Sequence, residues 1–238
     1  MLVFAYRLLP RGLAAALLAM LLTGMACPPA GAIEQSVRPG INAPYENADV
    51  QYWVGIFERE GREIWDQRQA IVAALNLKPG MAVADIGAGT GFFVRLFAER
   101  VGPEGRVYAV DIARNFVADI LRRARRDGQT WIQGIVNPPD RTALPPGELD
   151  LIFTSDTYHH FEYPRSMLAS IHRSLKSGGR FVVVDFERVP GLSSGWVLDH
   201  VRAGKEAVIR EVEAARFRLA EDAPLLRENY FLIFERVD

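Results

Sequence analysis

The chain of 238 residues has little cysteine and no excess of positive charge. Its single cysteine, Cys27, excludes both a disulfide framework within the chain and a zinc site built on clustered cysteines. Lysine and arginine number 28 against 29 acidic residues, so the formal net charge is −1. Without a basic excess, nucleic acid and an anionic membrane surface are not favoured as partners. The composition is that of an ordinary globular chain, long enough for one domain with a substantial core.

Long apolar runs are also scarce. The longest, residues 13–22, is short of the roughly 20 residues that a membrane-spanning helix needs. Two arginines precede it and the Ala-Gly-Ala of residues 30–32 follows it, a pattern that predicts a cleavable export signal over residues 1–32. We therefore expect an exported, periplasmic protein. A lipoprotein anchored at Cys27, an uncleaved N-terminal membrane anchor and a cytoplasmic protein with a misassigned start are the alternatives.

The remaining chain divides into a linker and a domain. Residues 33–50 are polar with proline and glycine, which predicts a disordered or draped linker. The domain then covers residues 51–238. Its first apolar pairs recur at helical spacing as far as Leu75, and Lys78-Pro79-Gly80 ends the predicted helix.

The most informative stretch is Val83–Phe93, an apolar run that ends in an acid and continues into three alternate glycines. It predicts a strand, a tight turn and the start of a helix. Glycine permits positive φ in such a turn and lets a ligand approach the backbone closely. The spacing excludes the dinucleotide fingerprint G-x-G-x-x-G, because Phe92 stands where its last glycine belongs, and the absence of Gly-Lys-Ser/Thr excludes a Walker phosphate loop.

The remaining pattern, acid-x-Gly-x-Gly-x-Gly, resembles motif I of the class I S-adenosylmethionine (SAM) dependent methyltransferases. The resemblance implies that the turn passes under the methionine part of SAM and that the acid orients the turn and the amino end. The implied cofactor contacts here are Asp85, Gly87, Ala88, Gly89 and Gly91. A glycine-rich loop of another α/β protein is the alternative.

A second acid, Asp111, ends the next predicted strand, Arg106–Asp111. At the carboxyl edge of a neighbouring strand, an acidic side chain can accept hydrogen bonds from ribose hydroxyls. This resembles the second signature of the family, and Ile112 is expected beside it at the cofactor. The alternative role for Asp111 is to cap the following helix. Past the third predicted strand, Asp140 or Asn137 is the candidate for the adenine of SAM.

The fourth predicted strand ends at Asp156, which we place among the cofactor contacts. Tyr158-His159-His160-Phe161 follows, at the edge where α/β sheets build their reaction centres. His159 and His160 are the candidate catalytic bases, and Tyr158 is a candidate substrate contact. Alternatively, one of the two adjacent histidines points into the packing. We expect no metal, because the two histidines and Glu162 are too close in sequence to converge easily.

The last predicted elements are a fifth strand, a helix and a closing hairpin. Trp196 and His200 lie before that helix and Arg202 lies where it opens. These three residues are candidate substrate contacts, or else they cap the helix and bind solvent. The family resemblance covers residues 65–236. It implies an α/β, doubly wound, Rossmann-like sheet of seven strands in the order 3-2-1-4-5-7-6, with the last strand antiparallel.

The resemblance implies transfer of a methyl group from SAM to a small-molecule acceptor of quinone-like, phenolic or lipid type. An exported, non-catalytic SAM-binding module is the alternative. No motif identifies the acceptor or an oligomeric state.

Overall fold

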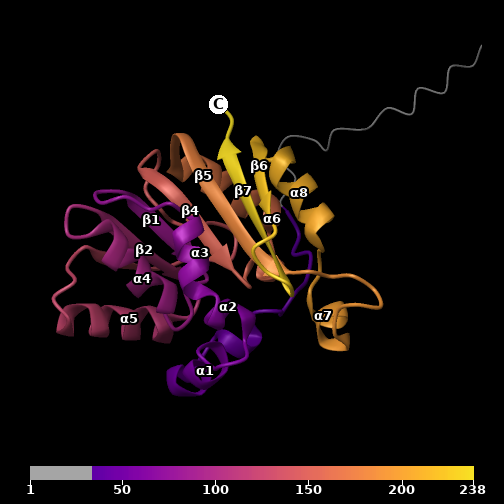
Figure 1. Cartoon of the computed structure of the whole chain (residues 1–238), viewed down its shortest axis with the longest axis horizontal. Helices are drawn as coiled ribbons and strands as arrows, with labels where there is room; N and C mark the ends of the chain where they lie inside the picture. The colour runs from indigo at the N-terminus through magenta and orange to yellow at the C-terminus, as the bar shows by residue number, and fades with distance from the viewer. Residues whose placement is uncertain (1–33) are drawn as a thin grey trace, which may run out of the picture. The chain divides into compact units, whose positions relative to one another are not determined.

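The computed structural model describes residues 34–238, so the predicted export signal of residues 1–32 lies outside the described residues (Figure 1). Within the described part of the chain, no helix is both long enough and apolar enough to cross a membrane.

The central element is a seven-stranded sheet in the order β3-β2-β1-β4-β5-β7-β6. All neighbouring strands pair in parallel except at β7, which runs antiparallel to both β5 and β6. The strands are β1 (Ala82–Ile86), β2 (Arg106–Asp111), β3 (Ile132–Val136), β4 (Leu149–Ser155), β5 (Leu175–Phe186), β6 (Phe217–Ala223) and β7 (Asn229–Arg236). The predicted strand order and the antiparallel last strand are confirmed.

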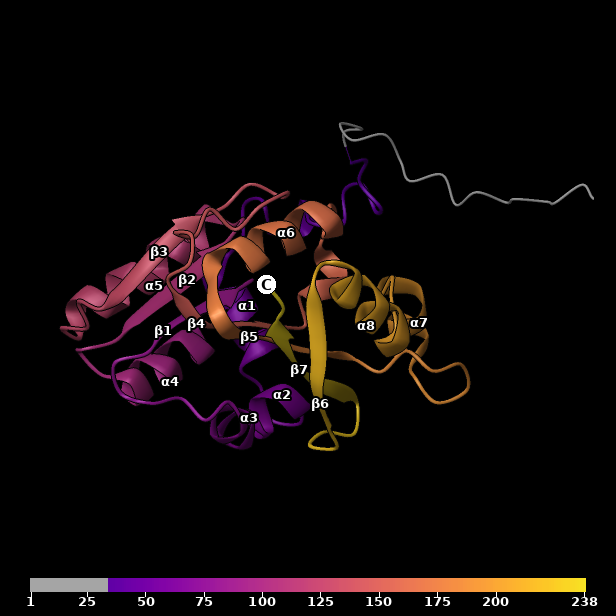
Figure 2. The same cartoon turned by 90° about the horizontal axis from the view of Figure 1, so that it is seen from above.

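Helices cover both faces of the sheet, so the strands are apolar on both sides. On one face, Val83 and Phe153 pack with residues of α3 (Arg68–Ala74), α4 (Phe92–Val101) and α5 (Arg114–Arg126). On the other face, Ala84 and Ile152 pack with α6 (Pro164–Ser174) and α8 (Lys205–Ala214). Figure 2 shows α3 and α4 on one side of the sheet and α6 on the other. Adjacent residues of one strand, such as Val83 and Ala84, pack on opposite faces of the sheet, as expected for a strand.

The N-terminal apolar pattern forms three short helices, where the sequence had predicted one. They are α1 (Val50–Phe57), α2 (Glu63–Asp66) and α3. Asp49 begins α1 by accepting hydrogen bonds from the backbone N–H groups of Gln51 and Tyr52. The break between α1 and α2 contains Gly61 at a φ of +82°, a left-handed conformation that a regular helix cannot include. The prediction of one helix was wrong because spacing alone does not register such a break.

Residues 34–49, which we call the strap, lie along the domain and contain one short 3-10 helix, η1 (Ala43–Tyr45). At one end of the strap, the Glu34 carboxylate accepts hydrogen bonds from the backbone N–H groups of Arg165 and Ser166, in the first turn of α6. Farther along, the side chain of Asn42 donates to the carbonyl of His160 at 3.1 Å. These bonds hold the strap in place beside the carboxyl edge of the sheet.

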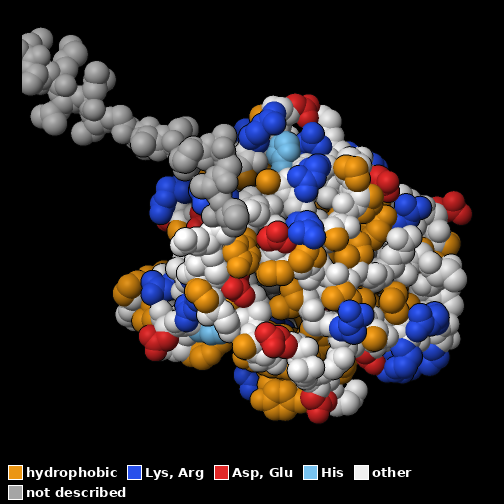
Figure 3. Space-filling view, turned by 180° about the vertical axis from the view of Figure 1, so that it is seen from behind, with side chains coloured by type: hydrophobic (Ala, Val, Ile, Leu, Met, Phe, Trp, Pro, Cys, Tyr) orange, Lys and Arg blue, Asp and Glu red, His pale blue; other side chains and the backbone are white. Residues whose placement is uncertain are grey.

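Charged side chains are mixed on the molecular surface. In Figure 3, lysine and arginine side chains are interspersed with aspartate and glutamate over the visible face, with no broad area of one sign. This matches the formal net charge of −1.

Candidate active site

A cavity of about 1300 Å³ opens at the carboxyl edge of the sheet. The turn after β1, the end of β2 and the segments after β4 and β5 form its floor, and the strap and α1 form its roof. Pockets for one small molecule usually measure roughly 300–1,000 Å³. The cavity is therefore large enough for a cofactor and a second small molecule together.

The glycine turn forms one end of the cavity. Gly87 and Gly89 both have positive φ, at +72° and +51°. A Cβ on Gly87 would overlap the side chain of Thr157, and one on Gly89 would lie 3.3 Å from the ring of Phe57. Glycine is therefore required at both positions, for the conformation and for space. Both residues line the cavity with Ala88, so a ligand can lie directly on the turn.

Two buried acids lie at this turn, and one of them, Asp111, binds its backbone. The Asp111 carboxylate accepts hydrogen bonds from the backbone N–H of Gly89 at 2.8 Å and of Ala113 at 2.7 Å. Burial raises the pKa of Asp111 to about 6, although these two hydrogen bonds oppose the shift. Burial and the charge of Asp111 raise the pKa of Asp85 to about 8. Two buried carboxylates that ionise at this turn favour a ligand that carries positive charge.

The residues of this end fit SAM. SAM carries an ammonium and a sulfonium group, and Asp85 and Asp111 supply negative charge beside a turn that accepts close approach. Asp111, Ile112 and Asn137 line the cavity where the ribose and adenine of SAM are expected from the family resemblance. Asp111 does not cap α5, because the N-cap residue of that helix is Ala113.

The middle of the cavity contains a partly buried ion pair. Arg62 donates to the Asp156 carboxylate at 2.6 Å and to the carbonyl of Phe57. Asn229, at the start of β7, donates to the other oxygen of Asp156 at 2.7 Å. Desolvation raises the pKa of Asp156, and the charge of Arg62 opposes that shift. Asp156 therefore joins the loop after α1 to the ends of β4 and β7.

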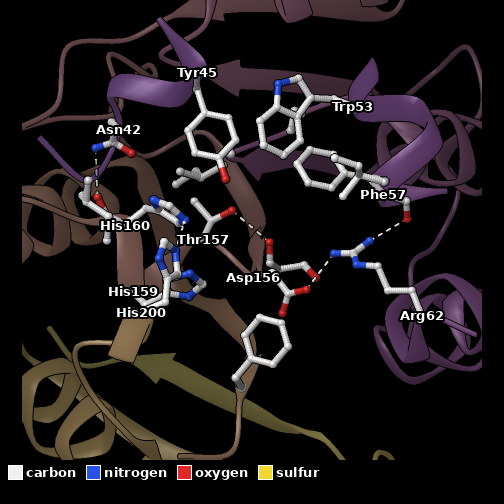
Figure 4. A pocket seen from close by; sticks show the side chains of 18 of the residues that line it. Asn42, Tyr45, Trp53, Phe57, Arg62, Asp156, Thr157, His159, His160 and His200 are labelled. Carbon is white, nitrogen blue, oxygen red and sulfur yellow. Dashed lines mark hydrogen bonds and ion pairs between the residues drawn. The ribbon is translucent and has the colours of Figure 1, made fainter. Parts of the chain in front are cut away.

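The other end of the cavity holds three histidines, shown in Figure 4. His159 and His160 belong to η2 (Tyr158–His160), directly after β4, and His200 ends α7 (Gly195–His200). The Nδ1 atom of His159 lies 2.7 Å from the carboxylate of Asp185, which also accepts from the backbone N–H of His159. Burial alone would raise the pKa of Asp185, but its contacts with His159 lower it below the usual value.

The histidines that face the cavity are held neutral. Desolvation, with the nearby charges of His159 and His200, lowers the pKa of His160 to about 3. Desolvation also lowers the pKa of His200. A neutral imidazole offers a nitrogen lone pair, so this end of the cavity can accept a proton or bind an electrophile.

An aromatic wall lies between the two ends of the cavity. Tyr45 of the strap packs on Trp53 with the ring centroids 4.7 Å apart, and Trp53 packs on Phe57 at 4.9 Å. Figure 4 shows the three rings in a row across from Asp156 and the histidines. A flat apolar ring is the kind of group that such a wall binds well.

The structure brings most of the predicted site residues together. Of the predicted cofactor, catalytic and substrate residues, those lining the cavity are Asp85, Gly87, Ala88, Gly89, Asp111, Ile112, Asp156, His159, His160, Trp196 and His200. Their contacts with a ligand remain predictions.

Four predicted site residues lie outside the cavity. Gly91 begins α4, and a Cβ there would meet Ile120 of α5, so this glycine serves helix packing. Asp140 is exposed and pairs with Arg141. Tyr158 is fully buried and donates to Glu211, which also forms a bidentate pair with Arg202.

Tyr158 and Arg202 lie outside the cavity for the same physical reason. A tyrosine or arginine placed next to a catalytic segment can still turn towards the core when a partner is available there, and Glu211 of α8 is that partner for both side chains. Asp140 pairs with Arg141 and does not line the cavity, whereas Asn137 and Pro139 of the same loop do.

Sequence reasoning missed three contributors to the site. Asp185 is the acid at the carboxyl end of β5 and could have been found by the rule applied to Asp85 and Asp111. Tyr45 and Asn42 lie in the strap, which had been interpreted as a linker. Nothing local in the strap signals that it returns to His160.

Comparison with known proteins agrees with this geometry. Residues 84–183 match the family described as "Methyltransferase domain". The chain is 31% identical over 118 residues to the ubiquinone/menaquinone biosynthesis C-methyltransferase UbiE of Bordetella avium, an alignment that covers 50% of this chain and 46% of that protein. The chain thus spans about half the length of the curated relatives it matches.

Solved structures share the fold at low sequence identity. A SAM-dependent methyltransferase from Aquifex aeolicus superposes with a TM-score of 0.70 at 21% identity, over 80% of this chain and 100% of that one. A Haemonchus contortus phosphoethanolamine N-methyltransferase 2, solved with phosphomonomethylethanolamine and S-adenosylhomocysteine, gives a TM-score of 0.66 at 17% identity, over 84% of this chain and 59% of that one. These structures show that the chain has the fold of SAM-dependent methyltransferases, and residues 84–183 carry the sequence match to the methyltransferase domain family.

Proposed function

We propose that this chain transfers the methyl group of SAM to a small molecule with a flat conjugated ring, of quinone-like or phenolic type. The observation that carries the proposal is the single cavity that joins the glycine turn to the histidines, with the aromatic wall between them. A cofactor at the turn and an acceptor at the histidines would share that space.

At the cofactor end, Asp85 and Asp111 would stabilise the positive charge and the ribose of SAM. Arg59 lines the cavity from the loop after α1 and is available for the carboxylate of SAM. Because the sulfonium already activates the methyl group, the protein mainly has to position the two molecules and exclude water. The Arg62–Asp156 pair holds the roof of the cavity in the position that this requires.

At the acceptor end, the aromatic wall favours a ring that can stack on Tyr45 and Trp53. The names of the matched relatives, which refer to ubiquinone and menaquinone biosynthesis, support the same class of acceptor. If the acceptor loses a proton on methylation, the neutral imidazole of His160 is placed to receive it.

The proposal is tested by incubating the purified full chain with methyl-labelled SAM and a panel of reduced quinones, simple phenols and a bacterial lipid extract. We expect label in a quinol or phenol product, formed together with S-adenosylhomocysteine. Asp111→Ala should abolish the transfer, and Asp140→Ala, outside the cavity, should keep it. A folded chain that binds SAM but labels none of these acceptors would contradict the proposal and favour a non-catalytic SAM-binding module.

A further inference from the structure

Three of the four histidines of the chain meet at one point of the cavity. One possible ligand nitrogen from each of His159, His160 and His200 lies within 4.8 Å of the others. The Nε2 atoms of His160 and His200 are 3.4 Å apart, although the two residues are separated by 40 positions in the sequence. Figure 4 shows the three rings turned towards one another.

This spacing fits a metal ion. Zinc binds histidine nitrogen at about 2.0–2.1 Å in tetrahedral geometry, which places two ligand nitrogens about 3.3–3.4 Å apart. The Nε2 atoms of His160 and His200 already have this separation. The nitrogen of His159 lies within 4.8 Å of the other two, so it would move closer to them to complete one face of a tetrahedron.

Each ring is held by a different neighbour. Asp185 binds Nδ1 of His159, which leaves Nε2 of that ring for a metal, an arrangement found around many histidine ligands. Trp196 stacks on His200 with the ring centroids 4.6 Å apart and an angle of 17°. Tyr45 meets the ring of His160 edge-on at 5.3 Å.

Hydrogen bonds within the protein do not satisfy this cluster. The Nδ1 atom of His160 is buried and has no hydrogen-bond partner among the described residues. The contact between His160 and His200 is long for a hydrogen bond, at 3.4 Å. The two Nε2 atoms are therefore open to an ion or a water molecule, whereas the unpartnered Nδ1 of His160 is not the nitrogen that would bind the ion.

We propose that His159, His160 and His200 bind a divalent transition metal ion, with Zn²⁺ as the first candidate. Three imidazoles suit zinc, copper, iron or nickel, whereas Mg²⁺ and Ca²⁺ prefer oxygen ligands. All three residues line the cavity, so the remaining coordination position faces the space proposed for the acceptor. This revises the expectation of no metal, which considered Glu162 as the third ligand. The carboxylate of Glu162 instead accepts from Ser36 and Asn42.

A role for the ion in methyl transfer rests on the proposed function, whereas metal binding does not. With the ion bound, His160 would be a ligand and could not also receive the proton of the acceptor, so these two roles of His160 are alternatives. A hydroxyl oxygen of a quinol or phenol could then bind at the open position. A zinc ion lowers the pKa of an oxygen ligand, so the O–H bond would break, its proton would pass to water, and the oxygen would keep the electron pair. The acceptor class would then be an aromatic hydroxyl compound.

The test measures metal binding directly, without any methyl acceptor. The full chain with Cys27→Ser, purified without a histidine tag and stripped with a chelator, is titrated with Zn²⁺ and Mg²⁺ by calorimetry, and with Co²⁺ by visible absorption. We expect one Zn²⁺ per chain, a tetrahedral Co²⁺ spectrum and no binding of Mg²⁺. His200→Ala should abolish Zn²⁺ binding, and Asp185→Asn should weaken it by about 10- to 100-fold, as expected for a residue that orients a ligand.

His172→Gln is the matched control, because His172 is the remaining histidine and its Nε2 contacts the carbonyl of Val237, away from the cavity. It should bind Zn²⁺ as the unsubstituted chain does. Thermal unfolding confirms that each variant is folded. Equal Zn²⁺ affinity in His200→Ala, or no Zn²⁺ binding by the folded chain, would overturn the proposal, whatever the result of the methyl-transfer assay.

Discussion

Single residues give this site its charge. Asp85 and Asp111 lie side by side under the glycine turn, with exposed fractions of only 3% and 6%. Burial disfavours the ionised form of both acids, and the charge of Asp111 further disfavours ionisation of Asp85. In the free protein, the ionised forms of both carboxyl groups are unfavourable. A bound cation stabilises these ionised forms, so the site favours a cationic ligand.

The first prediction concerns Asp85 and pH. The pKa of Asp85 is about 8 in the folded chain, well above the ordinary value, so the folded state holds a proton that the unfolded state has released. The contribution of Asp85 to the free energy of unfolding is fully present at low pH. It is lost as the pH rises to the folded-state pKa of about 8. We expect the melting temperature without SAM to fall between about pH 4 and pH 8, and to fall less in Asp85→Asn.

Thermal unfolding over this pH range, with and without SAM, measures the effect. SAM should reduce the loss of stability in the unsubstituted chain, because its ammonium group offsets the charge of Asp85. If the melting temperatures of the unsubstituted chain and of Asp85→Asn depend on pH in the same way, Asp85 is ionised in both the folded and the unfolded state.

The second prediction compares two acids that the sequence placed in the same site. Asp111→Ala removes the acceptor for two backbone N–H groups, at a cost of roughly 1–3 kcal/mol, and should weaken SAM binding at least about tenfold. Asp140→Ala removes an exposed pair with Arg141, worth about 0–1 kcal/mol, and should leave SAM binding unchanged. Calorimetric titration with SAM distinguishes them, and equal losses in both variants would contradict the assignment.

At the scale of elements, two segments cover the cavity. The loop between α1 and α2 is joined to the sheet through Arg62 and Asp156, whose side chains are only 18% and 11% exposed. The strap is joined through Glu34 and Asn42. The loop contacts Asp156 in the middle of the cavity, and the strap contacts His160 at the histidine end, so we expect the two segments to affect cofactor and acceptor separately.

Arg62→Met tests the loop between α1 and α2. It should leave Asp156 with Asn229 as its main partner, cost roughly 1–3 kcal/mol and weaken SAM binding. Hydrogen exchange should become faster over residues 50–62. Arg106→Met is the control, since Arg106 pairs with Glu148 on the exposed surface at 3.5 Å. Unchanged exchange in Arg62→Met would show that the ion pair does not hold the roof.

Tyr45→Ala tests the strap. The change removes one ring of the aromatic wall and the edge contact with His160. We expect the KM for the acceptor to rise several-fold while the affinity for SAM changes little, because the glycine turn is untouched. Steady-state kinetics and calorimetry measure the two quantities separately. A change confined to SAM affinity would place Tyr45 at the cofactor.

At the scale of the whole molecule, ligand binding and stability are linked. A ligand that binds only the folded chain adds about 2.7 kcal/mol at one hundred times its dissociation constant. For a domain of this size we expect SAM to raise the melting temperature by roughly 5–10 °C. The increase should disappear in Asp111→Ala, as thermal unfolding with and without SAM would show, and an equal increase there would mean that SAM binds elsewhere.

The sequence by itself determined the parts of this protein that depend on neighbours along the chain. Val83–Phe93 encodes a strand, a turn with required glycines and a helix within eleven consecutive positions, and Asp111 marks the end of the next strand. Strand order followed from the family resemblance carried by these motifs, and the structure confirms it.

Only the tertiary structure decided which side chains meet across long separations. His200 joins His159 and His160, Tyr45 returns to the cavity, and Glu211 draws Tyr158 and Arg202 into the core. These outcomes depend on how loops and short helices pack after the sheet has formed. Spacing in the sequence indicates which side of its own helix or strand a side chain occupies. The partner of that side chain lies on another element, and the packing of the elements determines which partner it meets.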